Sequence, residues 1–242
     1  MFYALEQHHV FLKMKDLSPE DYTAVRKFLV EHPVCTEKAF RDFKIKTRKV
    51  DIAEILDAAY EDIPEDSYYC PVCGWTMHFH GRQAVCCNRS CTVNHPVREE
   101  NRLIDNTNYK RLVHGVMRYM CIPGKLELEI QEKANKLGCK TKLWPNHDQY
   151  DIQITLPDVA IWAVDAKTHR NPYTLADSIR NDGAFVNVPA DKRLYVIPKE
   201  RTVDYPDYCD ICRNALKGKD VDCITEQELY RMLKGGCRNG RN

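Results

Sequence analysis

The sequence predicts a mixed protein of the α+β or α/β class with an N-terminal helical part, a short cysteine-rich part and a C-terminal mixed part. Three observations support this prediction. Apolar residues recur at helical spacing over residues 1–62, and two cysteine pairs flank a β-like stretch within 69–97. Residues 125–198 then read in order as a helix, three strands, a second helix and a fourth strand. We place the domain boundaries at 1–66, 67–97 and 98–242.

Composition is that of an ordinary globular chain. Of 242 residues, 43% are hydrophobic and 29% are charged, and the formal net charge of +1 excludes a uniformly basic nucleic-acid-binding protein. Basic residues still gather locally, in 38–49, 82–118 and the last twelve residues, as on a side that faces phosphate or on solvated helix faces. No apolar run has the length of a membrane helix, and the first twenty residues are too charged for a signal peptide, so we expect a cytoplasmic protein without a membrane partner.

Three short helices are expected in residues 1–66. Ser18 and Pro19 are a typical cap and first residue of a helix that ends at His32-Pro33. A second helix is expected after Thr36 and a third over residues 50–60. With the basic connector FKIKTRK, they form either a small DNA-contacting bundle or a subdomain that only packs.

Residues 69–97 carry two cysteine knuckles. Cys70 and Cys73 are followed by glycine, which makes a tight turn whose backbone amides face the sulfurs, and Cys91 pairs with Cys86 or Cys87. This resembles a zinc ribbon with a structural four-thiolate Zn²⁺ site, because so short a segment has too little core to fold without a metal. We favour Cys86 over Cys87 as the fourth ligand. Three histidines are near enough in sequence to replace a cysteine: His78, His80 and His95.

The C-terminal domain is expected to begin with two helices. The first is basic and covers residues 98–121, and the second runs from Lys125 to Leu137 and ends at Gly138. In the second helix, Glu127 lies closer to the apolar stripe than Glu129 does, because successive residues turn by about 100°. We therefore expect Glu127 to face the body of the domain.

Three strands follow, over residues 139–144, 150–156 and 161–167, and precede a helix over 171–179 and a strand over 193–198. Because side chains alternate along a strand, Asp165 and Lys167 share a face and Ala166 points away. A carboxylate and an ammonium at the end of an apolar strand are costly to bury unless something uses them. A surface ion pair on an edge strand is the alternative.

This order of elements has acidic residues at three informative places: Glu127 on a helix, Asp151 at the start of the second strand, and Asp165 two residues before Lys167. It resembles the PD-(D/E)xK restriction-endonuclease-like superfamily, over about residues 120–200, with an αβββαβ core. Tyr150 stands where the superfamily name has proline. The stretches PGKLELEI, LWPNHDQYDI and WAVDAK further resemble the nuclease subunits that accompany prokaryotic PIWI-type proteins in bacterial defence islands.

The resemblance implies a role for each residue of the motif. Asp151, Asp165 and the carbonyl of Ala166 would hold catalytic Mg²⁺ or Mn²⁺, for which hard oxygen ligands are suited. Glu127 would complete the metal shell, and Lys167 would orient or help deprotonate the attacking water.

The same resemblance implies a metal-dependent endonuclease that cuts DNA in antiviral defence, with a helicase or a PIWI-type protein as partner. His169 and Arg170 would hold phosphate. A catalytically degenerate nucleic-acid-binding adaptor is the alternative, and the motif does not distinguish DNA from RNA or define the oligomeric state.

The end of the chain is expected to form a last helix. Thr225 and Glu228 make a capping box, and Gly235-Gly236 is expected to end the helix. Irregular spacing disfavours a second metal site made by the remaining C-terminal cysteines: Cys209, Cys212, Cys223 and Cys237. The simplest interpretation of Cys35, Cys121 and Cys139 is that they are core residues.

Overall fold

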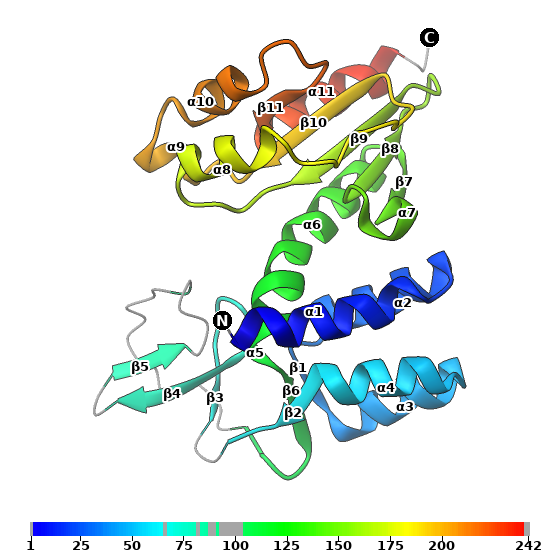
Figure 1. The fold of residues 1–242 in the computed structure, drawn as a ribbon, viewed down its shortest axis with the longest axis vertical. Coiled ribbons are helices and arrows are strands. Elements are labelled where there is room, and N and C mark those ends of the chain that lie inside the picture. Colours follow the sequence, from blue (N-terminus) through cyan, green and yellow to red (C-terminus); the bar gives the residue numbers. More distant parts are fainter. Residues whose placement is uncertain (1, 65–66, 81–82, 87–90, 92–103, 240–242) are drawn as a thin grey trace. The chain divides into compact units, whose positions relative to one another are not determined.

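The chain forms two compact units, Met1–Gly124 and Lys125–Asn242 (Figure 1). The computed structural model describes residues 2–64, 67–80, 83–86, 91 and 104–239. Each unit is described by itself. Among the helices in these ranges, none is both long and apolar enough to cross a membrane.

Four helices begin the first unit: α1 (Phe2–Lys15), α2 (Pro19–Glu31), α3 (Glu37–Thr47) and α4 (Val50–Ala59). The last three are the helices predicted from the sequence. Ser18 caps α2 by accepting a hydrogen bond from the backbone amide of Asp21, and Thr36 caps α3 by accepting one from that of Ala39. The caps therefore begin these helices where the sequence predicted.

Three strands from distant stretches form a small antiparallel sheet in the order β1-β6-β2. Their bounds are Val34–Thr36 for β1, Tyr60–Asp62 for β2 and Tyr109–Leu112 for β6. The prediction of a continuous helix over residues 98–121 is wrong at β6, because pairing with two strands far away in sequence overrides the local preference. The part of that predicted helix at 98–103 lies outside the described residues.

The pairing of β6 also bears on the boundary between domains. Beyond β6, the first unit continues through α5 (His114–Val116) and the π-helical turn η1 (Met117–Cys121) to Gly124, in the first turn of α6 (Ile122–Lys136). Residues 104–124 thus lie with the N-terminal helices, whereas the sequence suggested a C-terminal domain from residue 98. The contact pattern places the change of unit inside α6.

Two of the four basic residues of the connector FKIKTRK pair with acids of the first unit. Lys44 Nζ lies 2.7 Å from Asp57 Oδ1, and Lys49 forms an ion pair with Asp21. These ion pairs offset part of the positive charge that suggested contact with DNA, and a DNA-binding role of the N-terminal helices stays a prediction.

A second three-stranded sheet, in the order β3-β4-β5, supports the cysteine knuckles. It consists of β3 (Tyr68–Tyr69), β4 (Thr76–His80) and β5 (Gln83–Cys86). Strands β4 and β5 are antiparallel neighbours, with Met77 opposite Cys86. This is the hairpin expected between the two knuckles.

The second unit is built on a five-stranded mixed sheet in the order β11-β10-β9-β8-β7. Strands β7, β8 and β9 are antiparallel neighbours, whereas β9, β10 and β11 are parallel. Their bounds are Lys140–Leu143 for β7, Ile152–Thr155 for β8, Ile161–Ala166 for β9, Lys192–Ile197 for β10 and Asp222–Thr225 for β11. The first four are the predicted strands, and β9 is the central one.

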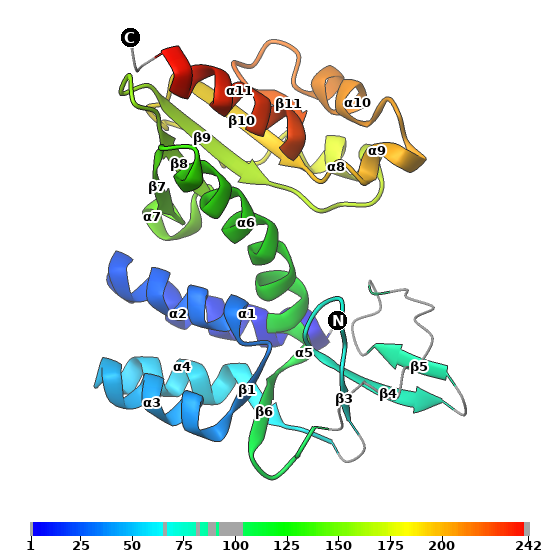
Figure 2. The ribbon, with the colours of Figure 1, turned by 180° about the vertical axis from the view of Figure 1, so that it is seen from behind.

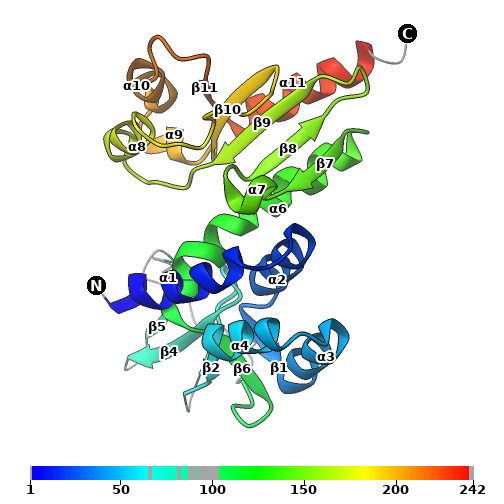
Figure 3. The same ribbon diagram turned by 45° about the vertical axis from the view of Figure 1, so that its right-hand side comes forward.

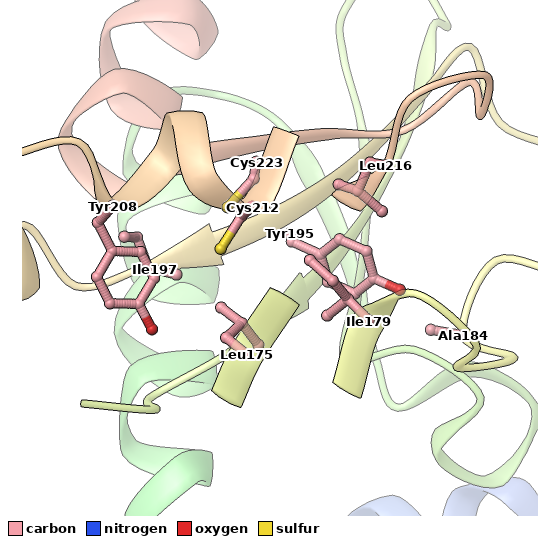
Figure 4. Packing of buried hydrophobic residues seen from close by; sticks show 9 residues of the cluster. All are labelled: Leu175, Ile179, Ala184, Tyr195, Ile197, Tyr208, Cys212, Leu216 and Cys223. Atoms are coloured by element: carbon pink, nitrogen blue, oxygen red, sulfur yellow. The ribbon is translucent and has the colours of Figure 1, made fainter. Parts of the chain in front are cut away.

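Helices cover both faces of this sheet (Figures 1 and 2). Helices α8 (Pro172–Ile179) and α10 (Tyr208–Ala215) lie on one face, and α11 (Glu226–Asn239) lies on the other. The short elements α7 (Pro145–Asp148) and α9 (Arg201–Asp204) lie in connections (Figure 3). Side chains of α8, α10, β10 and β11 form a common apolar core, which includes Tyr195, Cys212 and Leu216 (Figure 4).

Helix α11 continues through Gly235 and Gly236, so the prediction that these glycines end it is wrong. Tertiary packing overrides their low helix propensity. A Cβ atom at Gly236 would lie 2.6 Å from Leu156 Cδ2, whereas one at Gly235 would meet nothing within 4 Å. Gly236 therefore permits the helix to approach Leu156 closely.

We predict that Gly235→Ala raises the free energy of unfolding by up to about 1 kcal/mol, because alanine favours the helix. The matched variant Gly236→Ala should gain nothing or lose stability, because overpacking costs about 1–3 kcal/mol. Urea denaturation of the two proteins measures the difference. Equal stabilisation by both substitutions would contradict the close contact with Leu156.

Candidate active site and cysteine cluster

Four cysteines of the first unit converge on one point. The sulfur atoms of Cys70, Cys73, Cys86 and Cys91 all lie within 4.8 Å of one another. The first knuckle is a tight turn in which the Gly74 amide donates to the Cys70 carbonyl at 2.8 Å, with Gly74 in the left-handed region at φ 70°. These are the four predicted ligands.

The cluster has the donor set of a closed structural zinc site, since four thiolates suit tetrahedral Zn²⁺. His78 lies on β4 and is not one of the four converging ligands. Cys87, His95 and the side chain of His80 lie outside the described residues. Cys86 is thus one of the four converging cysteines, and the choice of Cys86 over Cys87 stays a prediction.

We predict that the purified chain carries about one Zn²⁺ in this cluster and that Cys86→Ser loses it, because a closed site needs all four ligands. Cys87→Ser is the matched control and should keep the metal. Elemental analysis of the dialysed proteins gives the zinc content. Loss of zinc in Cys87→Ser with retention in Cys86→Ser would move the fourth ligand to Cys87.

The C-terminal cysteines are divided between two places in the second unit. Cys139 Sγ lies 3.2 Å from Cys237 Sγ, and both residues are buried. Cys223 interacts instead with Cys209 and Cys212. Because Cys237 pairs with Cys139, the described residues do not form the four-cysteine second site considered from the sequence.

The Asp165–Lys167 pair lies at the end of the central strand of the second unit, with Asp165 on β9 and Lys167 directly after it. Lys167 Nζ is 2.6 Å from Asp165 Oδ1, and Asp165 is only 5% exposed. The pair is therefore not a surface ion pair on an edge strand. Burying such a pair costs several kcal/mol per ion unless further polar groups surround it.

Asp151 lies across from Asp165 on the neighbouring strand. The antiparallel register pairs Ile152 with Val164, and the Asp151 amide donates to the Val164 carbonyl at 3.1 Å. The buried carboxylate of Asp151 also accepts a hydrogen bond from the Ala166 amide at 2.6 Å. Both predicted aspartates thus occupy adjacent strands at one end of the sheet.

Two residues that the sequence did not indicate complete this group. Asp182, in the connection after α8, has Oδ2 3.8 Å from Lys167 Nζ, and its Oδ1 accepts a hydrogen bond from the Tyr195 hydroxyl. Tyr195 is the register partner of Asp165 on β10, and Lys167 Nζ lies 5.8 Å from the centre of its ring. We call Asp151, Asp165, Lys167 and Asp182 the lysine cluster.

Charge in the lysine cluster is strongly negative. Burial raises the pKa of Asp165 to about 6, although Lys167 opposes the shift, and the carboxylates of Asp182 and Asp148 add to it. Burial disfavours the charged form of Lys167, but Asp165, Asp151 and Asp182 outweigh it and raise the pKa of this lysine. With three carboxylates around one ammonium, the cluster has the charge and the oxygen donors to accept a divalent cation.

The connection between β7 and β8 has unusual backbone angles. Trp144, Asn146, His147 and Asp148 have φ values of 47°, 53°, 55° and 71°. Non-glycine residues in this left-handed region cost about 1–3 kcal/mol each, and such strain concentrates at functional sites. This connection also supplies Asp148, whose negative charge contributes to the raised pKa of Asp165.

Glu127 is buried on α6 and accepts a hydrogen bond from the indole Nε1 of Trp144. The backbone amide of Trp144 donates to the Asp151 carbonyl at 2.7 Å, so Trp144 connects Glu127 to the strand that carries Asp151. Within the described ranges, Glu127, Asp151 and Asp165 do not form a group of ligands as close as the cysteines do. A shared metal for these three carboxylates stays a prediction.

The two residues predicted to hold phosphate follow β9. His169 is half-buried, and burial, with Lys167 nearby, lowers its pKa, so the imidazole is mainly neutral at pH 7. Arg170 is exposed. A contact of either residue with phosphate stays a prediction. In such a contact, the neutral imidazole of His169 would donate a hydrogen bond to a phosphate oxygen.

Comparison with known proteins gave one family. Residues 124–241 match the family model pPIWI_RE_REase, described as "REase associating with pPIWI_RE". The matched range covers the whole described part of the second unit, including the lysine cluster. Searches of curated proteins and of solved structures gave no match.

Proposed function

We propose that residues 124–241, a restriction-endonuclease-like domain associated with prokaryotic PIWI, hydrolyse phosphodiester bonds of DNA with the help of Mg²⁺ or Mn²⁺. The observation that carries the proposal is the lysine cluster, with its buried Asp151 and Asp165, at the end of the central strand and inside the matched family range. An αβββαβ core formed by α6, β7, β8, β9, α8 and β10 is part of the proposal. Antiviral defence is the biological role that we infer.

The residues of the lysine cluster suit a hard divalent cation. Asp151 and Asp165 would hold it, with the Ala166 carbonyl and with Glu127, which is placed through Trp144. The buried carboxylates exceed the one ammonium in the cluster, and buried charges of one sign require a counter-charge. When bound, such an ion polarises the phosphodiester and lowers the pKa of a coordinated water.

The chain itself positions Lys167 for the reaction. Asp165 at 2.6 Å and Asp182 at 3.8 Å fix the ammonium above the Tyr195 ring. In that position Lys167 orients the attacking water and donates to a phosphate oxygen, where negative charge develops in the transition state. Asp182 and Tyr195 therefore act as positioning residues.

We predict that the protein nicks or cuts plasmid DNA with Mg²⁺ or Mn²⁺, and that Lys167→Met and Asp165→Asn each lower the rate by about 100-fold or more. Lys142→Met and Asp177→Asn are matched controls, because both side chains are exposed in the same unit. The controls should cut like the parent, and all four variants should keep their zinc.

The cleavage assay is run on the protein alone and with the PIWI-type partner. Unchanged cleavage in both Lys167→Met and Asp165→Asn would show that the site is assigned wrongly. Absence of cleavage in the parent under both conditions would refute the nuclease proposal. The same assay with RNA decides which nucleic acid is cut.

A catalytically degenerate adaptor that binds nucleic acid is the second candidate. One observation favours it: among the described residues, Glu127, Asp151 and Asp165 do not gather as closely as the cysteine ligands do. An adaptor binds DNA equally well with a chelator and with Mn²⁺. A nuclease site gains affinity for the phosphodiester when the metal is present.

A further inference from the structure

A cavity of about 450 Å³ lies beside the lysine cluster in the second unit. Two of its lining residues, Asp182 and Tyr195, are also the residues that position Lys167. The cavity therefore adjoins the lysine cluster through these two shared residues. Nothing in the proposed cleavage chemistry uses this space.

The walls of the cavity combine aromatic, apolar and charged groups. Phe185 is partly exposed, and its ring meets the buried ring of Tyr195 at an angle of 62° with the ring centres 5.0 Å apart, so Tyr195 supports Phe185 as an aromatic wall of the cavity. Val186 and Leu216 extend the apolar surface, and Figure 4 shows Leu216 beside Tyr195. This surface suits the face of a flat ring.

The charged groups lie on the rim and are held by other parts of the chain. Arg193 Nη1 is 2.8 Å from Asp220 Oδ2, and its Nη2 donates to the Val188 carbonyl at 2.8 Å. Lys219 donates to the Arg180 carbonyl. The rim thus offers fixed cations and a carboxylate around an aromatic interior, whereas a site for phosphate alone has no use for such an interior.

We propose that this cavity binds a nucleobase, placed there by the nucleic-acid strand whose phosphate lies at Lys167. The inference rests on the proposed nuclease function. The volume falls within the range of about 300–1,000 Å³ typical of ligand sites, and bases of any sequence can stack on an aromatic side chain. Because a paired base must first be unstacked, the site favours single-stranded or distorted DNA.

Val186 gives a way to fill the cavity without disturbing the core. Its side chain lines the cavity and is 59% exposed, so Val186→Trp adds an indole at the opening. Val203 on α9 is 76% exposed and does not line the cavity, which makes Val203→Trp the matched control. Equal unfolding midpoints of the two variants and the parent verify that both fold.

The experiment measures binding of fluorescent single-stranded DNA oligonucleotides to the zinc-loaded full chain in buffer without Mg²⁺ or Mn²⁺, where the proposed cleavage does not proceed. One oligonucleotide carries bases throughout, and the other is abasic. The parent and Val203→Trp should bind the first about tenfold or more tightly than the second, which corresponds to one stacked base. Val186→Trp should bind the base-carrying oligonucleotide about tenfold more weakly than the parent does, and should bind the abasic oligonucleotide as the parent does.

A second arm identifies the source of the base. Deoxynucleoside 5′-monophosphates are titrated as competitors of the oligonucleotide. Weak competition, lost in Val186→Trp, supports a base held within the strand. Strong competition by one monophosphate, also lost in Val186→Trp, supports the same nucleobase site with a free nucleotide as its ligand.

Two results would overturn the proposal. In the first, the parent binds the abasic oligonucleotide as tightly as the normal one. In the second, Val186→Trp weakens both oligonucleotides alike, as expected if this surface binds only the backbone or another protein. The failures of the two proposals can be told apart. If the parent cleaves DNA but binds the normal and abasic oligonucleotides equally, only the cavity proposal is rejected. If the parent prefers the normal oligonucleotide but does not cleave DNA, only the nuclease proposal is rejected.

Discussion

The ion pair of buried Asp165 with partly buried Lys167, at the end of the central strand, is the interaction on which the candidate site of the second unit depends. Taking such charges out of water costs more than their mutual attraction returns unless other groups bind them. Here the Lys167 ammonium faces Asp151 and Asp182 as well as Asp165, and it lies over the Tyr195 ring. The residues of the lysine cluster therefore compensate one another's charge, which is a structural role besides any chemical one.

The mixed sheet is what brings these neighbours together. The antiparallel pairing of β8 with β9 sets Asp151 beside Asp165, and the parallel pairing of β9 with β10 sets Tyr195 on its other side. A parallel neighbour requires a long crossover, and the crossover from α8 to β10 carries Asp182 and Phe185. The same crossover therefore contributes to the lysine cluster and to the adjacent cavity.

Local patterns in the sequence were enough to predict the elements that carry the site. Alternation along residues 150–167 predicted that Asp165 and Lys167 share a face, and cysteine spacing predicted the four converging sulfurs. Asp182 and Tyr195 escaped prediction because the register between parallel strands depends on residues distant in sequence. Two further elements were missed for a related reason. Strand β6 forms because it pairs with strands distant in sequence, and α11 continues through Gly235 and Gly236 because it packs closely on Leu156.

The central claim is that the lysine cluster holds a divalent metal, and calorimetric titration of the zinc-loaded protein with Mn²⁺ tests it most directly. The account predicts saturable binding that Asp151→Asn weakens by about tenfold or more, while Asp177→Asn, on the exposed surface of α8, leaves it unchanged. Saturable Mn²⁺ binding of equal affinity in the parent and in Asp151→Asn, or no binding in the parent, would contradict it.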